Sequence, residues 1–180
     1  MADRVVHCLP ARTLVLGGAR SGKSRYAEGL ITASAPPWIY LATAQPLDEE
    51  MAARIAEHRA RRRAGWTIVE APLKLASAIA ANAGSGTPLL VDCLTLWLSN
   101  VMLAGFDVEG ACRRLTNALH DAAGPIVLVS NEVGLGVVPD NALARAFRDA
   151  QGRLNQDVAA LADRVVLMAA GLPLTLKTVA

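Results

Sequence analysis

The most constraining feature of this 180-residue chain is residues 17–24, which read GGARSGKS and match the phosphate-binding pattern G-x-x-x-x-G-K-[ST]. The pattern requires a strand before it and a helix after it. Residues 13–16 form a short apolar run with strand character, and residues 24–33 carry apolar side chains near one helix face. Lysine is scarce, with three lysines against fifteen arginines, yet Lys23 occupies the lysine position of the motif. We therefore interpret the motif as a triphosphate-binding loop and not as a chance match.

The chemistry expected of such a loop depends on its backbone and on two side chains. Its N–H groups and the following helix N-terminus converge on phosphate oxygens. Lys23 is expected to reach the β- and γ-phosphates, and Ser24 to bind Mg²⁺. Asp92 ends the apolar run 88–91, in the form of a strand that delivers a carboxylate to the same ion. The alternative for Asp92 is an N-cap of the next helix, and the two roles are compatible.

Apolar runs alternate with helical patterns along the chain. The expected strands are residues 13–16, 38–42, 67–69, 89–91, 126–129 and 165–168. The expected helices are residues 24–33, 48–63, 73–83, 94–103, 108–122 and 141–162, the last with a break near Gly152. This alternation predicts an α/β fold of the P-loop (RecA-like) class, with a mostly parallel sheet flanked by helices. Residues 172–178 follow a turn too short for a crossover, which predicts an antiparallel C-terminal edge strand.

Length and composition indicate one nucleotide-binding domain, residues 13–180, after an N-terminal extension, residues 1–12. The net charge of +2 and the local clustering of arginines argue against nucleic-acid binding. Polar residues interrupt the most hydrophobic stretch, residues 89–106, so stable membrane insertion is not expected. The N-terminus lacks a signal-peptide pattern. Three cysteines without a C-x-x-C pair are typical of reduced thiols in a cytoplasmic protein: Cys8, Cys93 and Cys112.

Residues 48–63 place a histidine among arginines. Met51 and Ile55 form an apolar pair at the spacing of one helix face. A stripe at helical spacing carries Arg54, His58, Arg61 and Arg62. The arginines would neutralise a triphosphate, and their charge would favour a neutral imidazole whose nitrogen attacks phosphorus. The alternative is a solvated basic face with an incidental histidine, and composition alone favours it.

Ligands of open α/β sheets bind outside the carboxyl ends of the strands. That rule selects residues 17–24, 43–45 and 130–136, together with Glu70, Asp92 and Thr95. Residues 130–136 hold three polar residues and two glycines, which suits a site loop, although a simple glycine-containing connection is the alternative. The polar residues of the helix at 141–161 are mostly typical of a solvated or subunit-facing surface.

Several segments in a fixed order resemble one known family over about residues 13–177. They are residues 17–25 (GGARSGKSR), 40–45 (YLATAQ), Asp48 with 50–55 (EMAARI) leading to His58, Trp66 with Glu70, 130–139 (SNEVGLGVVP) and 148–156 (RDAQGRLNQ). The chain thereby resembles the bifunctional adenosylcobinamide kinase / adenosylcobinamide-phosphate guanylyltransferase family of cobalamin biosynthesis. Among these segments, only the first is generic to P-loop proteins, and their order makes the resemblance specific.

The resemblance implies two reactions. The family phosphorylates the aminopropanol hydroxyl of adenosylcobinamide with ATP or GTP, and then transfers GMP from GTP to the product with release of pyrophosphate. The second reaction passes through a histidine that carries GMP, and by position this histidine is His58. GTP, ATP and Mg²⁺ are the implied cofactors, adenosylcobinamide is the implied substrate, and similar proteins form homotrimers.

The resemblance also implies a set of site residues. His58 and Lys23 take the catalytic roles, and Ser24 and Asp92 the metal-binding ones. The residues expected around the nucleotide are Gly18, Ala19, Arg20, Ser21, Gly22, Lys23, Ser24, Arg25, Thr43, Ala44, Gln45, Arg59, Ala60, Arg61, Glu70 and Asp92. Asp92 stands where some relatives carry Glu, so its reach toward a metal is shorter.

Two other classes of P-loop protein are compatible with the motif alone. A regulatory GTPase would carry an N-K-x-D element and a D-x-x-G segment after Asp92, and the sequence has neither. An ATP-dependent motor or assembly module would hydrolyse nucleotide without forming a covalent nucleotidyl intermediate.

Overall fold

The computed structural model describes residues 9–46, 48–61, 64–84 and 86–179; for residues 54, 58, 59 and 61 it describes the backbone alone. A seven-stranded sheet with the order β3-β2-β4-β5-β1-β6-β7 forms the centre of the described part. Its strands are β1 (Arg12–Gly17), β2 (Trp38–Ala42), β3 (Trp66–Glu70), β4 (Leu89–Asp92), β5 (Ile126–Asn131), β6 (Arg164–Ala169) and β7 (Leu172–Thr178). The helices are α1 (Lys23–Thr32), α2 (Glu49–Arg61), α3 (Leu75–Asn82), α4 (Leu94–Leu103), α5 (Val108–Asp121) and α6 (Ala142–Leu161).

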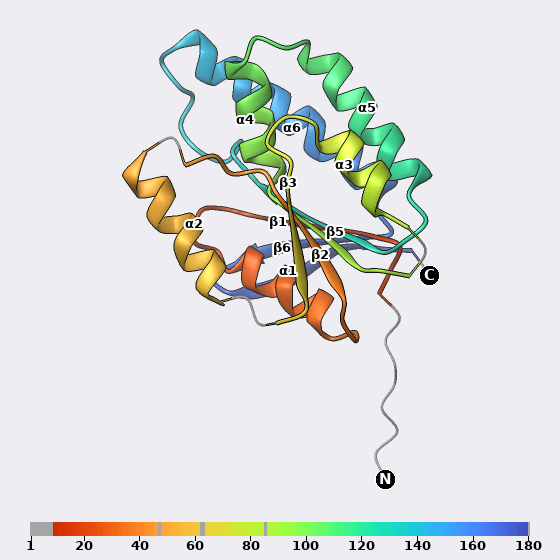
Figure 1. The fold of residues 1–180 in the computed structure, drawn as a ribbon. Coiled ribbons are helices and arrows are strands. Elements are labelled where there is room, and N and C mark those ends of the chain that lie inside the picture. Colours follow the sequence, from red (N-terminus) through yellow and green to blue (C-terminus); the bar gives the residue numbers. More distant parts are fainter. Residues whose placement is uncertain (1–8, 47, 62–63, 85, 180) are drawn as a thin grey trace.

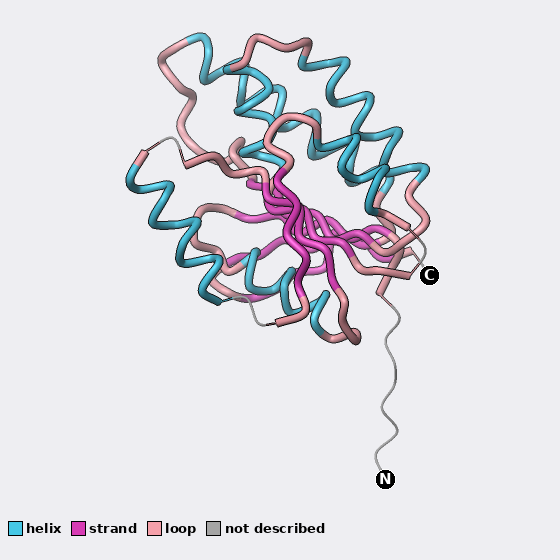
Figure 2. Tube along the Cα trace, viewed as in Figure 1, coloured by secondary structure: helices cyan, strands magenta, loops and turns pink. Residues whose placement is uncertain are grey.

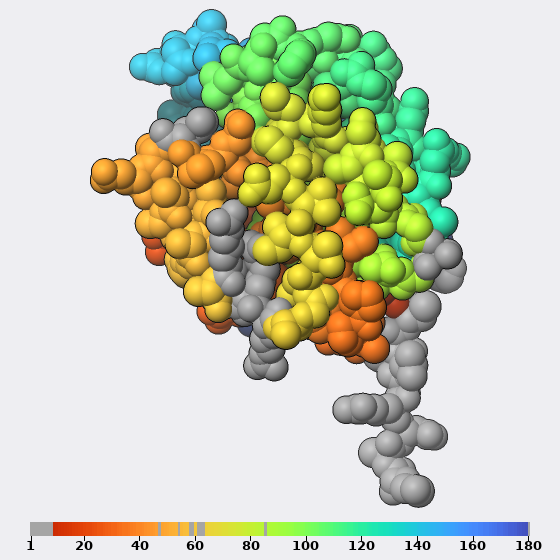
Figure 3. Space-filling view, viewed as in Figure 1, coloured from red at the N-terminus to blue at the C-terminus, as the bar shows by residue number. Residues whose placement is uncertain are grey.

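The central strands are apolar along nearly their whole length because both faces of the sheet are covered. Figure 1 shows α3, α4, α5 and α6 on one side of the sheet and α1 on the other, and Figure 2 shows the strands between these layers. The larger core cluster includes Trp97 and Leu115 from the four-helix side, and the smaller one includes Ile31 of α1. In the space-filling view, the orange residues of α2 lie on one side of the yellow residues of β3, and α3 lies on the other side (Figure 3).

The sheet register brings the functional strand ends to one edge. β1 pairs with β5 in parallel, with Gly17 opposite Asn131, and β4 pairs with β5 in parallel, with Asp92 opposite Val129. β2 and β3 extend the parallel part, whereas β7 pairs antiparallel with β6 at the far edge. The predicted fold class and the antiparallel edge strand are therefore confirmed.

One sequence-based expectation for the last helix is wrong, and a second holds with exceptions. α6 runs unbroken from Ala142 to Leu161, without the predicted break near Gly152. A glycine in a helix interior costs only about 1 kcal/mol, and α6 buries Leu154 and Val158 against the sheet. The mostly solvated surface expected for this helix also has an exception, because Gln151 and Asn155 are buried.

Several other bounds differ by one or a few residues, as expected at element ends. α2 ends at Arg61, whereas residues 62 and 63 of the expected helix lie outside the described residues. Of the N-terminal extension, residues 1–8 also lie outside the described part, and Cys8 with them. Leu9 packs against the smaller core cluster, and Arg12 already belongs to β1. Among the described residues, all the helices are too short or too polar to cross a membrane.

A buried amide joins two of the loops that leave the sheet. The Asn100 side-chain nitrogen, on α4, donates to the carbonyl oxygens of Thr43 at 2.8 Å and Pro72 at 3.1 Å. Thr43 follows β2 and Pro72 follows β3, so one side chain satisfies carbonyls from both loops. Buried main-chain groups of this kind need a partner because water does not reach them.

We predict that Asn100→Ala lowers the free energy of unfolding by about 2–4 kcal/mol, because two buried carbonyls lose their donor. Chemical denaturation monitored by circular dichroism measures the change. Ser99→Ala, at the neighbouring position of the same helix, is the control and should remain within about 0.5 kcal/mol of the wild type. A loss for Asn100→Ala no greater than that of the control would show that the loops do not depend on this side chain.

Candidate active site

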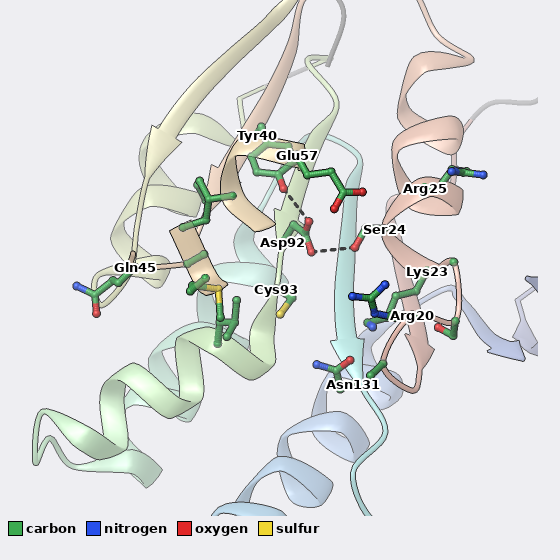
Figure 4. Close-up of a pocket in the computed structure, with 18 of the residues that line it drawn as sticks. Arg20, Lys23, Ser24, Arg25, Tyr40, Gln45, Glu57, Asp92, Cys93 and Asn131 are labelled. Atoms are coloured by element: carbon green, nitrogen blue, oxygen red, sulfur yellow. Dashed lines mark hydrogen bonds between the residues drawn. The ribbon is translucent and has the colours of Figure 1, made fainter. Parts of the chain in front are cut away.

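A cavity of about 1360 Å³ opens at the carboxyl edge of the parallel strands. Its walls come from the loop after β1, the ends of β2, β3, β4 and β5, and one face of α2. This is the position that the topology of an open α/β sheet predicts for a ligand. Figure 4 shows the polar side chains that these elements send into it.

The loop between β1 and α1 is shaped to receive an anion. Gly22 precedes α1 with φ of 93°, a left-handed conformation that favours glycine. It has no side chain to cap the helix, and the first turn of α1 carries no acidic residue. The N–H groups and the positive end of the helix dipole are therefore directed at the cavity, which suits a phosphate.

Two side chains of this loop fit the same ligand. The Lys23 ammonium folds back over the loop and donates to the carbonyl of Gly18 at 2.9 Å. The Ser21 hydroxyl oxygen is buried and has no hydrogen-bond partner in the described part of the chain. An unpaired buried hydroxyl beside a lysine provides donors that phosphate oxygens accept.

Asp92 is held between two hydroxyl groups at the end of β4. The Ser24 hydroxyl donates to Asp92 Oδ1 at 3.3 Å, and the Tyr40 hydroxyl donates to Oδ2 at 2.7 Å (Figure 4). The carboxylate thus lies beside the P-loop serine, as the strand motif predicts. The N-cap of α4 is Cys93 and not Asp92, so the alternative capping role is not seen.

These oxygen atoms are compatible with Mg²⁺. The ion prefers oxygen ligands, keeps several waters and is usually held by one or two protein groups together with substrate phosphates. Ser24 and Asp92 supply such a pair next to the phosphate-binding loop. In the described residues there is no group of three or more His, Cys, Asp and Glu side chains that would enclose a metal by itself.

Cys93 lines the cavity next to Asp92 but is buried. Burial raises the pKa of its thiol from 9.0 to about 11, and the neighbouring charge of Asp92 adds to the shift. The thiol therefore stays protonated at neutral pH. Its backbone is fixed by Thr43, whose hydroxyl donates to the Cys93 carbonyl and accepts from the Cys93 N–H, both at 2.8 Å.

Helix α2 forms the wall opposite the P-loop. Its cavity-lining residues are Met51, Ala52, Ile55, Ala56 and Glu57. His58, Arg59 and Arg61 belong to the next turn, but their side chains lie outside the described part of the structure. Ala60 is exposed and is not among the residues that line the cavity.

The cavity brings together most of the remaining predicted nucleotide-binding residues. They are Ala19, Arg20, Ser21, Gly22, Lys23, Ser24, Arg25, Ala44, Gln45, Glu70 and Asp92. Thr43 is fully buried behind the wall as the anchor of Cys93, and Gly18 contributes its carbonyl to Lys23. The candidate loop at 130–136 contributes Asn131, Glu132 and Val133 to the lining.

Sequence reasoning assigned no role to two residues that shape the site. Tyr40, in the middle of β2, fixes Asp92. The sequence did carry a signal for it, because Tyr40 belongs to the YLATAQ segment of the family resemblance. Asn155 fixes the carbonyl of Asn131 at 3.0 Å. The helical pattern of α6 offered no signal for this contact, because the two residues lie 24 positions apart.

Solved structures of low sequence identity share this fold. An ATPase from the type III secretion system of pathogenic bacteria matches with a TM-score of 0.56 at 14% identity, covering 93% of this chain and 57% of the other. A protein from Pyrococcus horikoshii matches with a TM-score of 0.55 at 9% identity, covering 97% and 90%. At these identities the likeness concerns the fold alone.

Sequence relatives are much closer. The bifunctional adenosylcobalamin biosynthesis protein CobP of Pseudomonas aeruginosa is 51% identical over 92% of this chain and 97% of its own length. The bifunctional adenosylcobalamin biosynthesis protein CobU of Salmonella typhimurium is 41% identical over 91% and 98%. Residues 13–176 match the family model described as cobinamide kinase / cobinamide phosphate guanyltransferase. With the P-loop, the Ser24–Asp92 pair and α2 placed around one cavity, these matches show that the chain belongs to the cobinamide kinase / cobinamide phosphate guanyltransferase family.

Proposed function

We propose that this protein phosphorylates the hydroxyl of adenosylcobinamide with ATP or GTP, and then transfers GMP from GTP to adenosylcobinamide phosphate through guanylylated His58. The second reaction yields adenosylcobinamide-GDP and releases pyrophosphate. The observation that carries the proposal is the contact of Ser24 with Asp92 beside a P-loop, in a chain that belongs to this family. The cavity is also large enough for a nucleotide and part of a second substrate.

In the phosphoryl transfer, the protein acts by position and charge. The N–H groups at the start of α1 bind phosphate oxygens, and Lys23 moves from the Gly18 carbonyl to the β- and γ-phosphates. Ser24 and Asp92 would hold Mg²⁺, which neutralises charge on the triphosphate when bound. Asp92 is kept in place for this role by Tyr40.

In the guanylyl transfer, a neutral imidazole of His58 attacks the α-phosphorus of GTP. A bond forms between the ring nitrogen and phosphorus while the bond to the bridging oxygen of pyrophosphate breaks. A phosphate oxygen of adenosylcobinamide phosphate then attacks the phosphorus of the histidine-bound GMP, and the bond from phosphorus to the His58 nitrogen breaks. Helical spacing supports the choice, because position 58 follows the cavity-lining Ile55 by three residues and Met51 by seven.

We predict that His58→Ala abolishes formation of labelled protein from α-labelled GTP, while kinase activity stays within about threefold of the wild type, because the imidazole serves only as the nucleophile. Gel electrophoresis with α-labelled GTP measures the labelling, and phosphorylation of adenosylcobinamide measures the kinase. His120→Ala, on the exposed face of α5, is the matched control and should label normally.

The same gel tests the alternative function. Hydrolysis of nucleotide by the wild type, without covalent labelling and without a requirement for corrinoid, would indicate a P-loop NTPase or regulatory module. Labelling of the His58→Ala protein would assign the nucleophile to another residue.

We predict that Asp92→Asn weakens Mg²⁺ binding and raises the Mg²⁺ concentration that half-saturates kinase activity about 10–100-fold, because one ionised ligand is lost. Isothermal titration of Mn²⁺, as an analogue of Mg²⁺, into the GDP-bound protein measures cation affinity without phosphoryl transfer. Asp121→Asn on the exposed end of α5 is the control and should leave both values unchanged. An unchanged Mn²⁺ affinity in Asp92→Asn would remove this residue from the metal site.

We also infer that the protein is a cytoplasmic homotrimer. The free cysteines Cys93 and Cys112 and the nucleotide substrates support the location. The edge strand β7 supports the assembly, because Leu172, Leu174 and Leu176 are 71%, 57% and 56% exposed along one side of it. Exposed apolar side chains on an unpaired edge are typical of a surface that associates with another chain.

We predict that the double variant Leu174→Glu/Leu176→Glu is monomeric at concentrations where the wild type is trimeric, because charge on this strand opposes burial at an interface. Sedimentation velocity measures the mass of each. Thr175→Glu places the same charge on the other side of the strand and should remain trimeric. A monomeric wild type would contradict the trimer, and a trimeric double variant would place the interface elsewhere.

A further inference from the structure

Asn131 occupies a special position in the sheet. It is the last residue of β5, the strand between β1, which leads into the P-loop, and β4, which ends in Asp92. The register sets Asn131 opposite Gly17, two residues beyond the level of Asp92. Its side chain lines the cavity, and Figure 4 shows it on the same side as Arg20 and Lys23.

The main chain of Asn131 is held on both sides by buried side chains. Its N–H donates to the hydroxyl of Thr95 on α4 at 2.8 Å, and its carbonyl accepts from the amide of Asn155 on α6 at 3.0 Å. Thr95 is 8% exposed and Asn155 is 6% exposed. Because both main-chain groups are paired with these helices, the backbone of Asn131 is held at the rim of the cavity that its side chain lines.

A second layer fixes Asn155. The Ser130 hydroxyl donates to Asn155 Oδ1 at 2.7 Å, and the side-chain nitrogen of Gln151 donates to the same oxygen at 2.9 Å. Gln151 also donates to the Ser130 hydroxyl at 2.9 Å and is fully buried. Polar groups are costly to bury unless they are paired. This network lies directly behind the end of β5 and holds one cavity residue in place.

The way in which P-loop proteins bind a triphosphate indicates which part of the nucleotide would lie next to Asn131. In P-loop proteins the lysine contacts the β- and γ-phosphates of the nucleotide. The metal ion, held by the P-loop serine and the strand aspartate, binds oxygens of the same two phosphates. Asn131 ends the strand that lies between the lysine and the metal site, so the γ-phosphate is the part of the nucleotide nearest to it. A side-chain amide donates a hydrogen bond there without changing the net charge of the site.

We propose that the side-chain amide of Asn131 donates to a γ-phosphate oxygen of the bound triphosphate, and that Asn155 and Gln151 are positioning residues for this contact. Asn131 then distinguishes a triphosphate from a diphosphate and stabilises the phosphoryl group during transfer. This catalytic part of the inference rests on the proposed kinase activity. In that step the acceptor oxygen bonds to the γ-phosphorus as the β,γ-bridging oxygen leaves with its electron pair, and the hydroxyl proton passes to water.

The test compares binding of two nucleotides that differ at the γ-phosphate. Fluorescent GDP displaced by unlabelled GDP or by GMPPNP, a GTP analogue with a non-cleavable β,γ bridge, gives both dissociation constants in the presence of Mg²⁺. Every protein in this binding assay also carries His58→Ala, because GMPPNP keeps the α,β bond that His58 would attack. Asn131→Ala should weaken GMPPNP about tenfold and GDP less than about twofold, since one hydrogen bond to a charged group is lost. Asn131→Asp keeps the shape but adds a charge that repels phosphate, so its loss for GMPPNP should exceed that of alanine.

The kinetic arm separates the two reactions. Asn131→Ala should lower the kinase kcat about 100-fold, as removal of one transition-state donor does in other enzymes. Labelling by α-labelled GTP at saturating nucleotide should fall less than about fivefold, because the γ-phosphate is not the reacting group in that step. Asn155→Ala should shift the ratio of GMPPNP to GDP affinity in the same direction, which a purely structural role would not do. Asn117→Ala, on the exposed side of α5, is the matched control.

Each outcome has a distinct meaning. Equal weakening of GDP and GMPPNP, or an unchanged ratio of their affinities in Asn131→Ala, would overturn the contact. Asn131→Ala and Asn131→Asp both keep the main-chain bonds, so thermal melting should show both variants folded. A wild type that binds GMPPNP through Asn131 but does not phosphorylate adenosylcobinamide would refute the proposed function and leave the γ-phosphate contact standing.

Discussion

The parallel register of β2, β4, β5 and β1 is the constraint on which the whole cavity depends. Side chains alternate between the two faces of a strand, so a slip of one residue in β4 would move Asp92 to the opposite face of the sheet. It would then lose both Ser24 and Tyr40. The register is protected by burial of both faces of the sheet, since a slip would also displace the apolar side chains that form the two core clusters.

Beyond the strand ends, a different kind of interaction holds the site. The loops no longer have a neighbouring strand to satisfy their main-chain groups, and these groups are buried or partly buried. Side chains from the helices supply the missing partners: Thr95 and Asn100 from α4, and Asn155 from α6. The apolar packing of the sheet therefore positions the strand ends, and polar side chains from the helices hold the loops that follow them.

Patterns of neighbouring residues predicted the parts of this structure that depend on interactions close in the sequence. The P-loop, the strand that ends in Asp92 and the antiparallel β7 follow from spacing, periodicity and a short turn. The prediction of a break at Gly152 was wrong, because one glycine destabilises a helix by less than the packing of α6 on the sheet stabilises it.

Other features required information that local patterns do not contain. Burial of Gln151 and Asn155 depends on Ser130, which lies 21 and 25 residues away and belongs to another element. The role proposed for His58 rests on family resemblance, because a histidine among arginines is also typical of a solvated surface. Contacts between distant polar residues are set by tertiary packing and have no periodic signature.

The buried thiol of Cys93 has a consequence for chemical selectivity. A thiolate is a strong nucleophile, and this sulfur lies in the wall of a cavity suited to electrophilic phosphorus. Its pKa of about 11 keeps the sulfur in the unreactive thiol form at physiological pH. Burial thus excludes a competing thiophosphate adduct and also slows oxidation of the thiol. The packing that buries Cys93 in the wall of the cavity therefore also keeps its thiol unreactive.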